Sequence, residues 1–227
     1  MDAEHEKQLA AQAAADFVED GMTIGLGTGS TVSRFLPLLA ARGLRLRCVA
    51  TSLRTEEEAR ALGLAVEPFT GVDALDRLDL AVDGADQIAP SGWVIKGNGA
   101  AHTREKVVAV AAARFVVIAS SDKLVDRLRP PVPLELLSFG LAATLRRLGP
   151  ASSRDAPPSP DGNVIADYHG DVADPVALAA KLSSDPGVVG HGLFAPTLVS
   201  EFLIGRGDRV ERITPPEVSR AEPRGRG

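Results

Sequence analysis

Three short segments of this 227-residue chain combine glycines with side chains that can bind an anion or move a proton. The first, GLGTGST at residues 25–31, has glycines that let the backbone approach an anion, and Thr28, Ser30 and Thr31 have hydroxyls that can donate to it. It lacks the sixth-position glycine of the dinucleotide-binding fingerprint and the lysine of the NTPase loop. The loop therefore favours a phosphomonoester, and the alternative is a tight strand-to-helix turn without a ligand.

The second segment, VDGADQI at residues 82–88, places two aspartates at the end of an apolar strand. We expect the carboxylates of Asp83 and Asp86 to point into the cleft above the sheet. Such a pair could bind a divalent metal or sugar hydroxyls, and hydroxyls are favoured because no histidine or third carboxylate is nearby. The alternative is a turn in which each aspartate caps backbone amides.

The third segment, IKGNGAAHTREK at residues 95–106, joins a lysine–glycine turn to the start of a helix. Glu105 is followed by the apolar run KVVAVAAA, a setting that can desolvate a carboxylate and raise its pKa toward neutrality, as a general base requires. Lys96 is one of only five lysines among 25 basic residues, which favours a role that needs a compact ammonium rather than an arginine fork. The alternative is a solvated helix face with local ion pairs.

These segments follow strands in an alternating strand–helix pattern, which indicates βαβ units and a parallel sheet covered on both faces. We therefore expect residues 1–128 to form a doubly wound, mostly parallel α/β domain of the Rossmann-like class, with the polar segments at the carboxyl ends of its strands. Thr55 and Glu58 form a capping box that predicts the start of one helix. The expected helices span 3–20, 31–42, 55–62 and 104–113, and the expected strands span 22–27, 44–51, 64–69, 78–86 and 115–122.

Beyond residue 128 the pattern changes, and residues 129–197 predict a smaller α+β, ferredoxin-like domain. The proline-rich PPVPLELL is expected to cross between the domains, and the polar residues 150–163 to form a loop. Residues 198–227 are assigned back to the first domain, with a disordered tail, PPEVSRAEPRGRG, at the end. The other expected elements are helices at 138–149 and from Asp174–Pro175 onward, and strands at 163–169, 187–194, 198–205 and 208–213.

Composition and charge exclude several classes of protein. With 44% hydrophobic and 24% charged residues the chain is globular rather than disordered, and a net charge of −5 argues against nucleic acid as a partner. The single cysteine, Cys48, forms no internal disulfide, and the scattered histidines lack zinc-ligand spacing. The charged N-terminus is unlike a signal peptide, and no apolar run approaches the roughly 18 residues of a membrane helix. We expect a cytoplasmic protein without a membrane span or structural metal.

The order of these motifs along residues 7–205 closely resembles the type A ribose-5-phosphate isomerases. The resemblance implies interconversion of ribose 5-phosphate and ribulose 5-phosphate through an enediolate, without metal or organic cofactor, in the non-oxidative branch of the pentose phosphate pathway. It also implies a homodimer or homotetramer. The matching segments are GLGTGST, VDGADQI, IKGNGAAHTREKVVA, ASSDK, PVPLELL, GNVIADYHG, DPGVVGHGLF and LIG.

Carried onto this chain, the resemblance makes Glu105 the base that moves the proton between C2 and C1. Asp83 would assist ring opening, and Asp86 and Lys96 would hold hydroxyls and offset the developing oxyanion. Lys7 occupies a position that resembles a phosphate contact. The other substrate-binding residues implied are Thr28, Gly29, Ser30, Thr31, Gly84, Ala85, Gly97, Asn98, Gly99 and Lys123.

The chain departs from the family pattern at several positions. Asn98 and Ala100 stand where glycine is usual. Asparagine at 98 tolerates an unusual backbone angle, but it narrows the loop. His102 stands in place of leucine and His191 in place of an apolar residue. The loop at 149–162 also differs and is expected to lie away from the chemistry. These departures bear on substrate preference more than on reaction type.

Two other interpretations use the same fold. A non-catalytic sugar-phosphate-sensing module would not need Glu105, and such modules usually carry a DNA-binding segment, for which we expect no room in this chain. A related enzyme, such as an amino-sugar-phosphate deaminase or a CoA transferase, is disfavoured by the intact DGAD and REK motifs.

Overall fold

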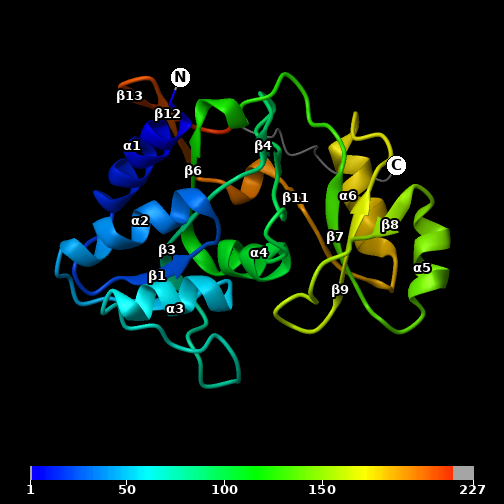
Figure 1. Ribbon diagram of the computed structural model, residues 1–227, viewed down its shortest axis with the longest axis horizontal. Helices are drawn as coiled ribbons and strands as arrows, with labels where there is room; N and C mark the ends of the chain where they lie inside the picture. Colours follow the sequence, from blue (N-terminus) through cyan, green and yellow to red (C-terminus); the bar gives the residue numbers. More distant parts are fainter. Residues whose placement is uncertain (1, 217–227) are drawn as a thin grey trace, which may run out of the picture.

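The computed structural model describes residues 2–216, and its larger part is built on a six-stranded sheet (Figure 1). The strand order is β13-β12-β6-β3-β1-β2, and all neighbours are parallel except the β12–β13 hairpin. The mostly parallel sheet predicted from the sequence is confirmed. Its strands are β1 Thr23–Leu26, β2 Arg47–Ala50, β3 Leu78–Asp83, β6 Ala112–Ser120, β12 Glu201–Arg206 and β13 Arg209–Ile213.

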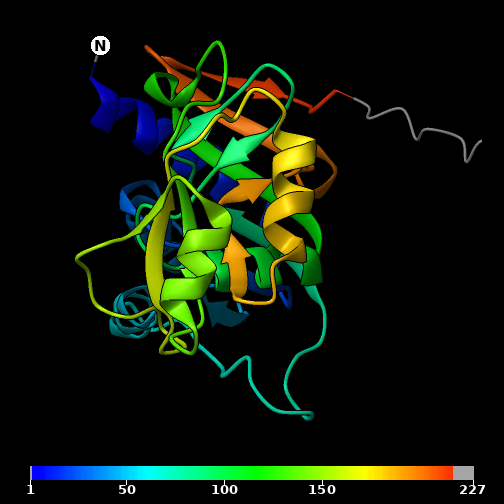
Figure 2. The ribbon, with the colours of Figure 1, turned by 90° about the vertical axis from the view of Figure 1, so that its right-hand side faces the viewer.

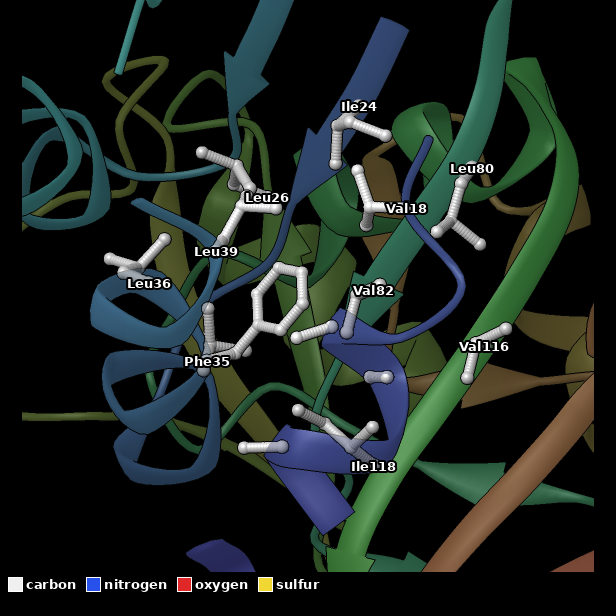
Figure 3. Close-up of a cluster of buried hydrophobic side chains, with 14 of the residues drawn as sticks. Val18, Ile24, Leu26, Phe35, Leu36, Leu39, Leu80, Val82, Val116 and Ile118 are labelled. Atoms are coloured by element: carbon white, nitrogen blue, oxygen red, sulfur yellow. The ribbon is translucent and has the colours of Figure 1, made fainter. Parts of the chain in front are cut away.

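Helices cover both faces of this sheet, because side chains of the buried strands point alternately to either face. Val82 of β3 packs in one layer with Phe35, whereas its neighbour Ala81 packs in the opposite layer with Val108. Figure 3 shows the first layer, in which the Phe35 ring lies between its own helix and Val82. That layer includes residues of α1 Ala3–Ala15, α2 Ser30–Ala41 and α3 Leu53–Ala61, and the second layer includes residues of α4 His102–Ala111.

A smaller antiparallel sheet, seen in Figure 2 from the side of its two helices, forms the rest of the molecule. Its element order β-α-β-β-α-β and strand order β10-β7-β9-β8 are those of the predicted ferredoxin-like unit. We propose 129–197 as its domain limits, since these strands all lie within them. The elements are β7 Val132–Leu136, α5 Leu141–Leu148, β8 Ala151–Ser153, β9 Val164–Tyr168, α6 Pro175–Ser184 and β10 Val188–His191.

A third, three-stranded sheet joins the two units. Its middle strand β5 pairs antiparallel with β4 on one side and with β11 on the other, and β11 follows β10 of the smaller sheet after one residue. The sequence pattern did not predict it, because strands this short show no periodicity. β5 leads directly into Lys96, so this sheet places the lysine–glycine turn. The strands are β4 Gln87–Ile88, β5 Val94–Ile95 and β11 Leu193–Phe194.

Several predicted elements differ from the structure. Residues 130–137, expected to cross between domains, instead supply β7, an inner strand of the smaller sheet. The predicted loop at 150–163 contains the edge strand β8, whose exposed serines conceal any alternation. Residues 64–69 form no strand and make only an isolated bridge between Val66 and Cys48.

The first helix ends at Ala15 rather than at residue 20. The amide of Val18 bonds to the Ala15 carbonyl in a tighter turn, which buries the Val18 side chain in the core. At the other end, the strand predicted at 208–213 is confirmed as β13. Residues 217–227, which hold most of the predicted disordered tail, lie outside the described residues. Within residues 2–216, no helix has the length and apolar character needed to cross a bilayer.

Candidate active site

The three polar segments meet at the carboxyl edge of the six-stranded sheet and line one cavity of about 290 Å³. Parallel strands end at the same edge, so loops distant in sequence converge there. Every site residue predicted from the sequence lines this cavity except Asp83 and Lys7. The lining residues are Thr28, Gly29, Ser30, Thr31, Gly84, Ala85, Asp86, Lys96, Gly97, Asn98, Gly99, Glu105 and Lys123.

Asp83 lies directly beneath the first glycine loop. A Cβ at Gly27 would lie 2.1 Å from the Asp83 carboxylate, so only glycine fits there, and the Thr28 amide donates to Asp83 Oδ1 at 3.0 Å. Gly29 has a φ of +112°, which favours glycine, and directly precedes α2. The loop thus brings the first amides of α2 to the cavity, where they can bind an anion.

Ser52 connects the glycine loop to α3. The capping box predicted at Thr55 is wrong, because Ser52 is the cap and its Oγ accepts from the Thr55 amide at 3.2 Å. Thr28 Oγ1 donates to Ser52 Oγ at 2.9 Å and lies 2.8 Å from Thr51 Oγ1. The Thr28 hydroxyl is therefore engaged below the cavity. Sequence reasoning missed Thr51 and Ser52 because the pairing of β1 with β2 brings them here.

Asp83, Lys96 and Glu105 form a buried charge cluster in which each side chain is at most 5% exposed. Lys96 Nζ lies 3.0 Å from Asp83 Oδ2 and 3.1 Å from Glu105 Oε2, and it donates to the Gly84 carbonyl. Two expectations are corrected. Asp83 lies beneath the cavity instead of pointing into it, and a third carboxylate, Glu105, is near the aspartates.

The Lys96 ammonium lies between the carboxylates of Asp83 and Glu105 and offsets part of their charge. Among residues 2–216, no group of three or more histidine, cysteine, aspartate or glutamate side chains is arranged to hold a metal.

The cluster gives Glu105 the basicity that proton transfer needs. Burial and the charge of Asp83 raise the pKa of Glu105 to about 8, against the opposing effect of Lys96. Burial alone would lower the pKa of Lys96, but Asp83 and Glu105 raise it above its usual value, so the amine stays protonated. Burial also raises the pKa of Asp83, opposed chiefly by Lys96. A near-neutral base thus stands beside a fixed cation.

The turn after Lys96 is held by the second aspartate, since the Asn98 amide donates to Asp86 Oδ2 at 2.9 Å. The unusual backbone angle in this turn lies at Ala100 and not at Asn98, although asparagine tolerates such an angle. The φ of Ala100 is +60°, the one positive value outside glycine in residues 2–216. The Ala100 amide bonds to the Gly97 carbonyl at 3.1 Å and closes the turn. The geometry of the closed turn determines which residue adopts the left-handed conformation, even though asparagine tolerates a positive φ better than alanine.

The remaining two lysines of the predicted site differ in position. Lys123 follows β6, lines the cavity and has its Nζ 3.3 Å from Asp122 Oδ2. Lys7 is absent from the lining, and its Nζ donates to Glu4 Oε1 at 2.7 Å. The neighbouring Glu6 was missed: it accepts from the amide and hydroxyl of Ser121, at 2.8 and 2.7 Å, and so ties α1 to the loop that carries Lys123.

The loop at 149–162 contacts the site, contrary to expectation. Arg154 Nη1 donates to the carbonyl oxygen of Asn98 at 3.1 Å, and Asp161 pairs with Arg104, the residue before Glu105. The polar composition of the segment predicted a surface loop but not these contacts, which depend on how the two units pack.

Together, the doubly wound sheet, the anion-binding loop and the buried carboxylate beside a fixed ammonium define an α/β enzyme that acts on a small anionic substrate by proton transfer. The profile of the family Ribose 5-phosphate isomerase A (phosphoriboisomerase A) matches residues 47–209. The chain belongs to this family.

Individual relatives agree over nearly the whole chain. Ribose-5-phosphate isomerase A of Roseiflexus castenholzii is 45% identical over 97% of this chain and 100% of its own length. The protein of the same name from Caulobacter vibrioides is 44% identical over 95% of this chain and 100% of its own. The crystal structure of ribose 5-phosphate isomerase A from Neisseria gonorrhoeae superposes with a TM-score of 0.86 at 31% identity, covering 93% of this chain and 96% of its own.

Proposed function

We propose that this protein is a ribose-5-phosphate isomerase, which interconverts D-ribose 5-phosphate and D-ribulose 5-phosphate. Membership of the family supports this reaction. The observation that carries it in this chain is the contact of Glu105, a carboxylate with a near-neutral pKa, with the Lys96 ammonium at 3.1 Å on the wall of a cavity that begins at an anion-binding loop. A similar structure, 34% identical with a TM-score of 0.86, was solved with phospho-erythronic acid, which supports a phosphorylated substrate here.

In the open-chain sugar, Glu105 takes the proton from C2 and returns it to C1. The negative charge that develops on oxygen in the enediolate lies next to Lys96, whose ammonium is already held in place by two carboxylates and needs no reorganisation. Asp86 lines the cavity and holds sugar hydroxyls. The base and the cation both come from the third polar segment of the sequence, and the hydroxyl acceptor comes from the second.

Ring opening precedes this proton transfer, and Asp83 is the residue that the family resemblance proposes for it. Because Asp83 is buried beneath Lys96 and the Thr28 amide, its effect on the ring reaches the substrate through these two groups. A substitution at Asp83 would therefore displace both the ammonium and the glycine loop.

The phosphate is bound by the first amides of α2, the hydroxyls of Ser30 and Thr31, and Lys123, which belong to the lining of the cavity. Binding energy gained there aligns the far carbon with Glu105, which is how a remote phosphate increases the rate of a reaction at C1 and C2. Gly84, Ala85, Gly97 and Gly99 complete the cavity wall. Lys7 would reach a phosphate only after leaving Glu4.

The resemblance also supports a place in the non-oxidative branch of the pentose phosphate pathway, a cytoplasmic location, and assembly as a homodimer or homotetramer. Light scattering on the purified protein measures the assembly. A monomer at assay concentration would contradict that part of the proposal without affecting the reaction.

The purified protein is expected to isomerise ribose 5-phosphate without added metal and to keep its rate in chelator. Glu105→Gln should lower kcat by roughly 10²- to 10⁴-fold, the contribution of a positioned general base. Glu57→Gln, an exposed change on α3, is the matched control and should leave the rate unchanged. The same assay includes arabinose 5-phosphate as a competitor of ribose 5-phosphate. A protein that binds ribose 5-phosphate without turnover would instead be a sensing module, and full activity of Glu105→Gln would exclude Glu105 as the base.

A further inference from the structure

Arg154, which directly follows β8 of the smaller sheet, divides its guanidinium between two partners. Nε and Nη2 form a bidentate pair with Asp167 of β9, at 3.0 and 2.6 Å. Nη1 is thereby directed at the lysine–glycine turn, where it donates to the carbonyl oxygens of Gly97 at 3.3 Å and of Asn98 at 3.1 Å. The side chain is only 22% exposed, so these bonds are partly shielded from water.

These bonds determine the direction of two amides in the cavity wall. A trans peptide bond points its carbonyl oxygen and its N–H to opposite sides. Because Arg154 draws the Gly97 carbonyl toward itself, the Asn98 N–H turns away from it, and that N–H donates to Asp86 at 2.9 Å. By the same geometry, the bond to the Asn98 carbonyl turns the Gly99 N–H away from Arg154, and Gly99 lines the cavity.

Other contacts prevent the turn from retreating from Arg154. Gly97 packs so closely on its inner side that a Cβ would lie 2.7 Å from both His102 Nδ1 and Pro133 Cβ. Seven residues beyond Arg154, Asp161 forms a bidentate pair with Arg104 at 2.8 and 2.7 Å. Residues 154–161 of the smaller unit therefore hold both the turn that follows Lys96 and the start of α4, which precedes Glu105.

We propose that Arg154 is a positioning residue of the isomerase, which orients the peptide planes of residues 97–99 so that their amides meet Asp86 and the sugar. The proposal rests on the proposed function, because the amides matter only if this cavity holds the sugar. Arg154 itself does not line the cavity and acts through the turn. A lysine cannot replace it, since one ammonium cannot pair bidentately with Asp167 and also reach two carbonyl oxygens.

The test is the steady-state kinetics of Arg154→Met with ribose 5-phosphate. Loss of two charge-assisted bonds to the turn should raise KM about tenfold, with a smaller fall in kcat. Arg147→Met is the matched control: Arg147 makes the same bidentate pair, with Asp185 at 2.8 and 2.8 Å, on the same unit but away from the turn. It should lose comparable stability and leave KM unchanged.

Two further variants separate positioning from folding. Arg154→Lys should recover stability in part but retain a raised KM, and ethylguanidinium added to Arg154→Ala should lower its KM toward that of the parent protein. The proposal is overturned if Arg154→Lys and Arg154→Met, compared per folded molecule, have the parent KM. Inactivity of the parent protein on ribose 5-phosphate would reject the proposed function, whereas an active parent together with the parent KM in both variants rejects only the role of Arg154.

Discussion

Glu105 is basic because of its surroundings, and this has a measurable consequence. Its pKa is raised to about 8 by burial and by Asp83, so it is mostly protonated at neutral pH in the free enzyme. A base must be ionised to accept the C2 proton. We therefore expect kcat/KM to rise with pH through neutrality and to level off above about pH 8.

The pH–rate profile of the free enzyme measures this. Lys96→Met should move the rising limb to higher pH, because the ammonium lowers the pKa of Glu105, and it should also lower kcat by removing the charge beside the enediolate. A profile that is already flat from about pH 6 upward would contradict the raised pKa.

Substitutions at Gly97 and Ala100, which lie in the same turn, are expected to differ in their effect on stability. Gly97→Ala places a Cβ at a φ of +117° and 2.7 Å from His102 Nδ1 and Pro133 Cβ, so it should cost about 1–3 kcal/mol of unfolding free energy. Ala100→Gly relieves about 1 kcal/mol of left-handed strain in the folded protein. It also raises the conformational entropy of the unfolded chain, which costs a similar amount, so its net effect on the unfolding free energy should be small. Denaturant unfolding of both variants gives the comparison. Equal stabilities would show that the turn has room that these distances exclude.

For single residues, the sequence predicted which side chains belong to the site better than where each one lies in it. The types and order of residues around Lys96 and Glu105 singled out these two side chains, which lie 3.1 Å apart in the structure. The burial of Asp83 beneath the loop could not be predicted, because it depends on how Gly27 packs against it. The positive φ at Ala100 could not be predicted for a similar reason, since it depends on the bond that closes the turn, from the Ala100 amide to the Gly97 carbonyl.

At the scale of elements, Ser52 has two roles that a variant can separate. It caps α3 and also accepts from the Thr28 hydroxyl. Ser52→Ala should therefore lower stability by about 1 kcal/mol and raise KM for the phosphate ester, because the glycine loop loses a support. Asp174→Ala is the matched control, since Asp174 caps α6 by accepting from the Ala177 amide at 2.9 Å, far from the glycine loop in sequence and on the other unit.

Thermal unfolding and steady-state kinetics of the pair decide the question. Asp174→Ala should lose stability without a change in KM. If Ser52→Ala behaves identically, the bond to Thr28 has no part in binding.

The elements best predicted were those with a continuous apolar run, such as β3 and β6, or with a clear start signal, such as the helix that follows Asp174 and Pro175. The cap of α3 was misplaced because a serine and a threonine compete three residues apart, and each could serve. Strand β8 and the strands of the three-stranded sheet are defined by partners distant in sequence. No local pattern could show such pairings.

For the whole molecule, two buried histidines make stability depend on pH. Burial lowers the pKa of His102 to about 4 and that of His191 to about 3, from an ordinary value of 6.5. Between pH 6.5 and about pH 4, His102 is protonated in the unfolded chain but stays neutral in the folded protein. The stabilising contribution of the neutral rings is therefore complete above pH 6.5 and is lost as the pH falls from 6.5 toward 4.

Urea unfolding across this range measures the decline in stability. His102→Leu should make the decline shallower, because leucine has no proton to bind in the unfolded state. His169→Leu, a change at an exposed histidine, is the control and should follow the parent protein. Identical slopes for all three proteins would exclude His102 as a source of the acid sensitivity.

Among the parallel strands of the large sheet, β12 is the last to be synthesised. β12 pairs with β6 along Glu201–Gly205, but the whole smaller unit lies between these strands in sequence. At roughly 5–20 residues per second, a nascent chain would wait on the order of ten seconds between the two. During that time β6 presents an apolar, hydrogen-bonding edge, a template for mispairing with other chains. We expect chaperones to bind ribosome-stalled chains that end just before residue 201 more strongly than chains that extend past residue 213.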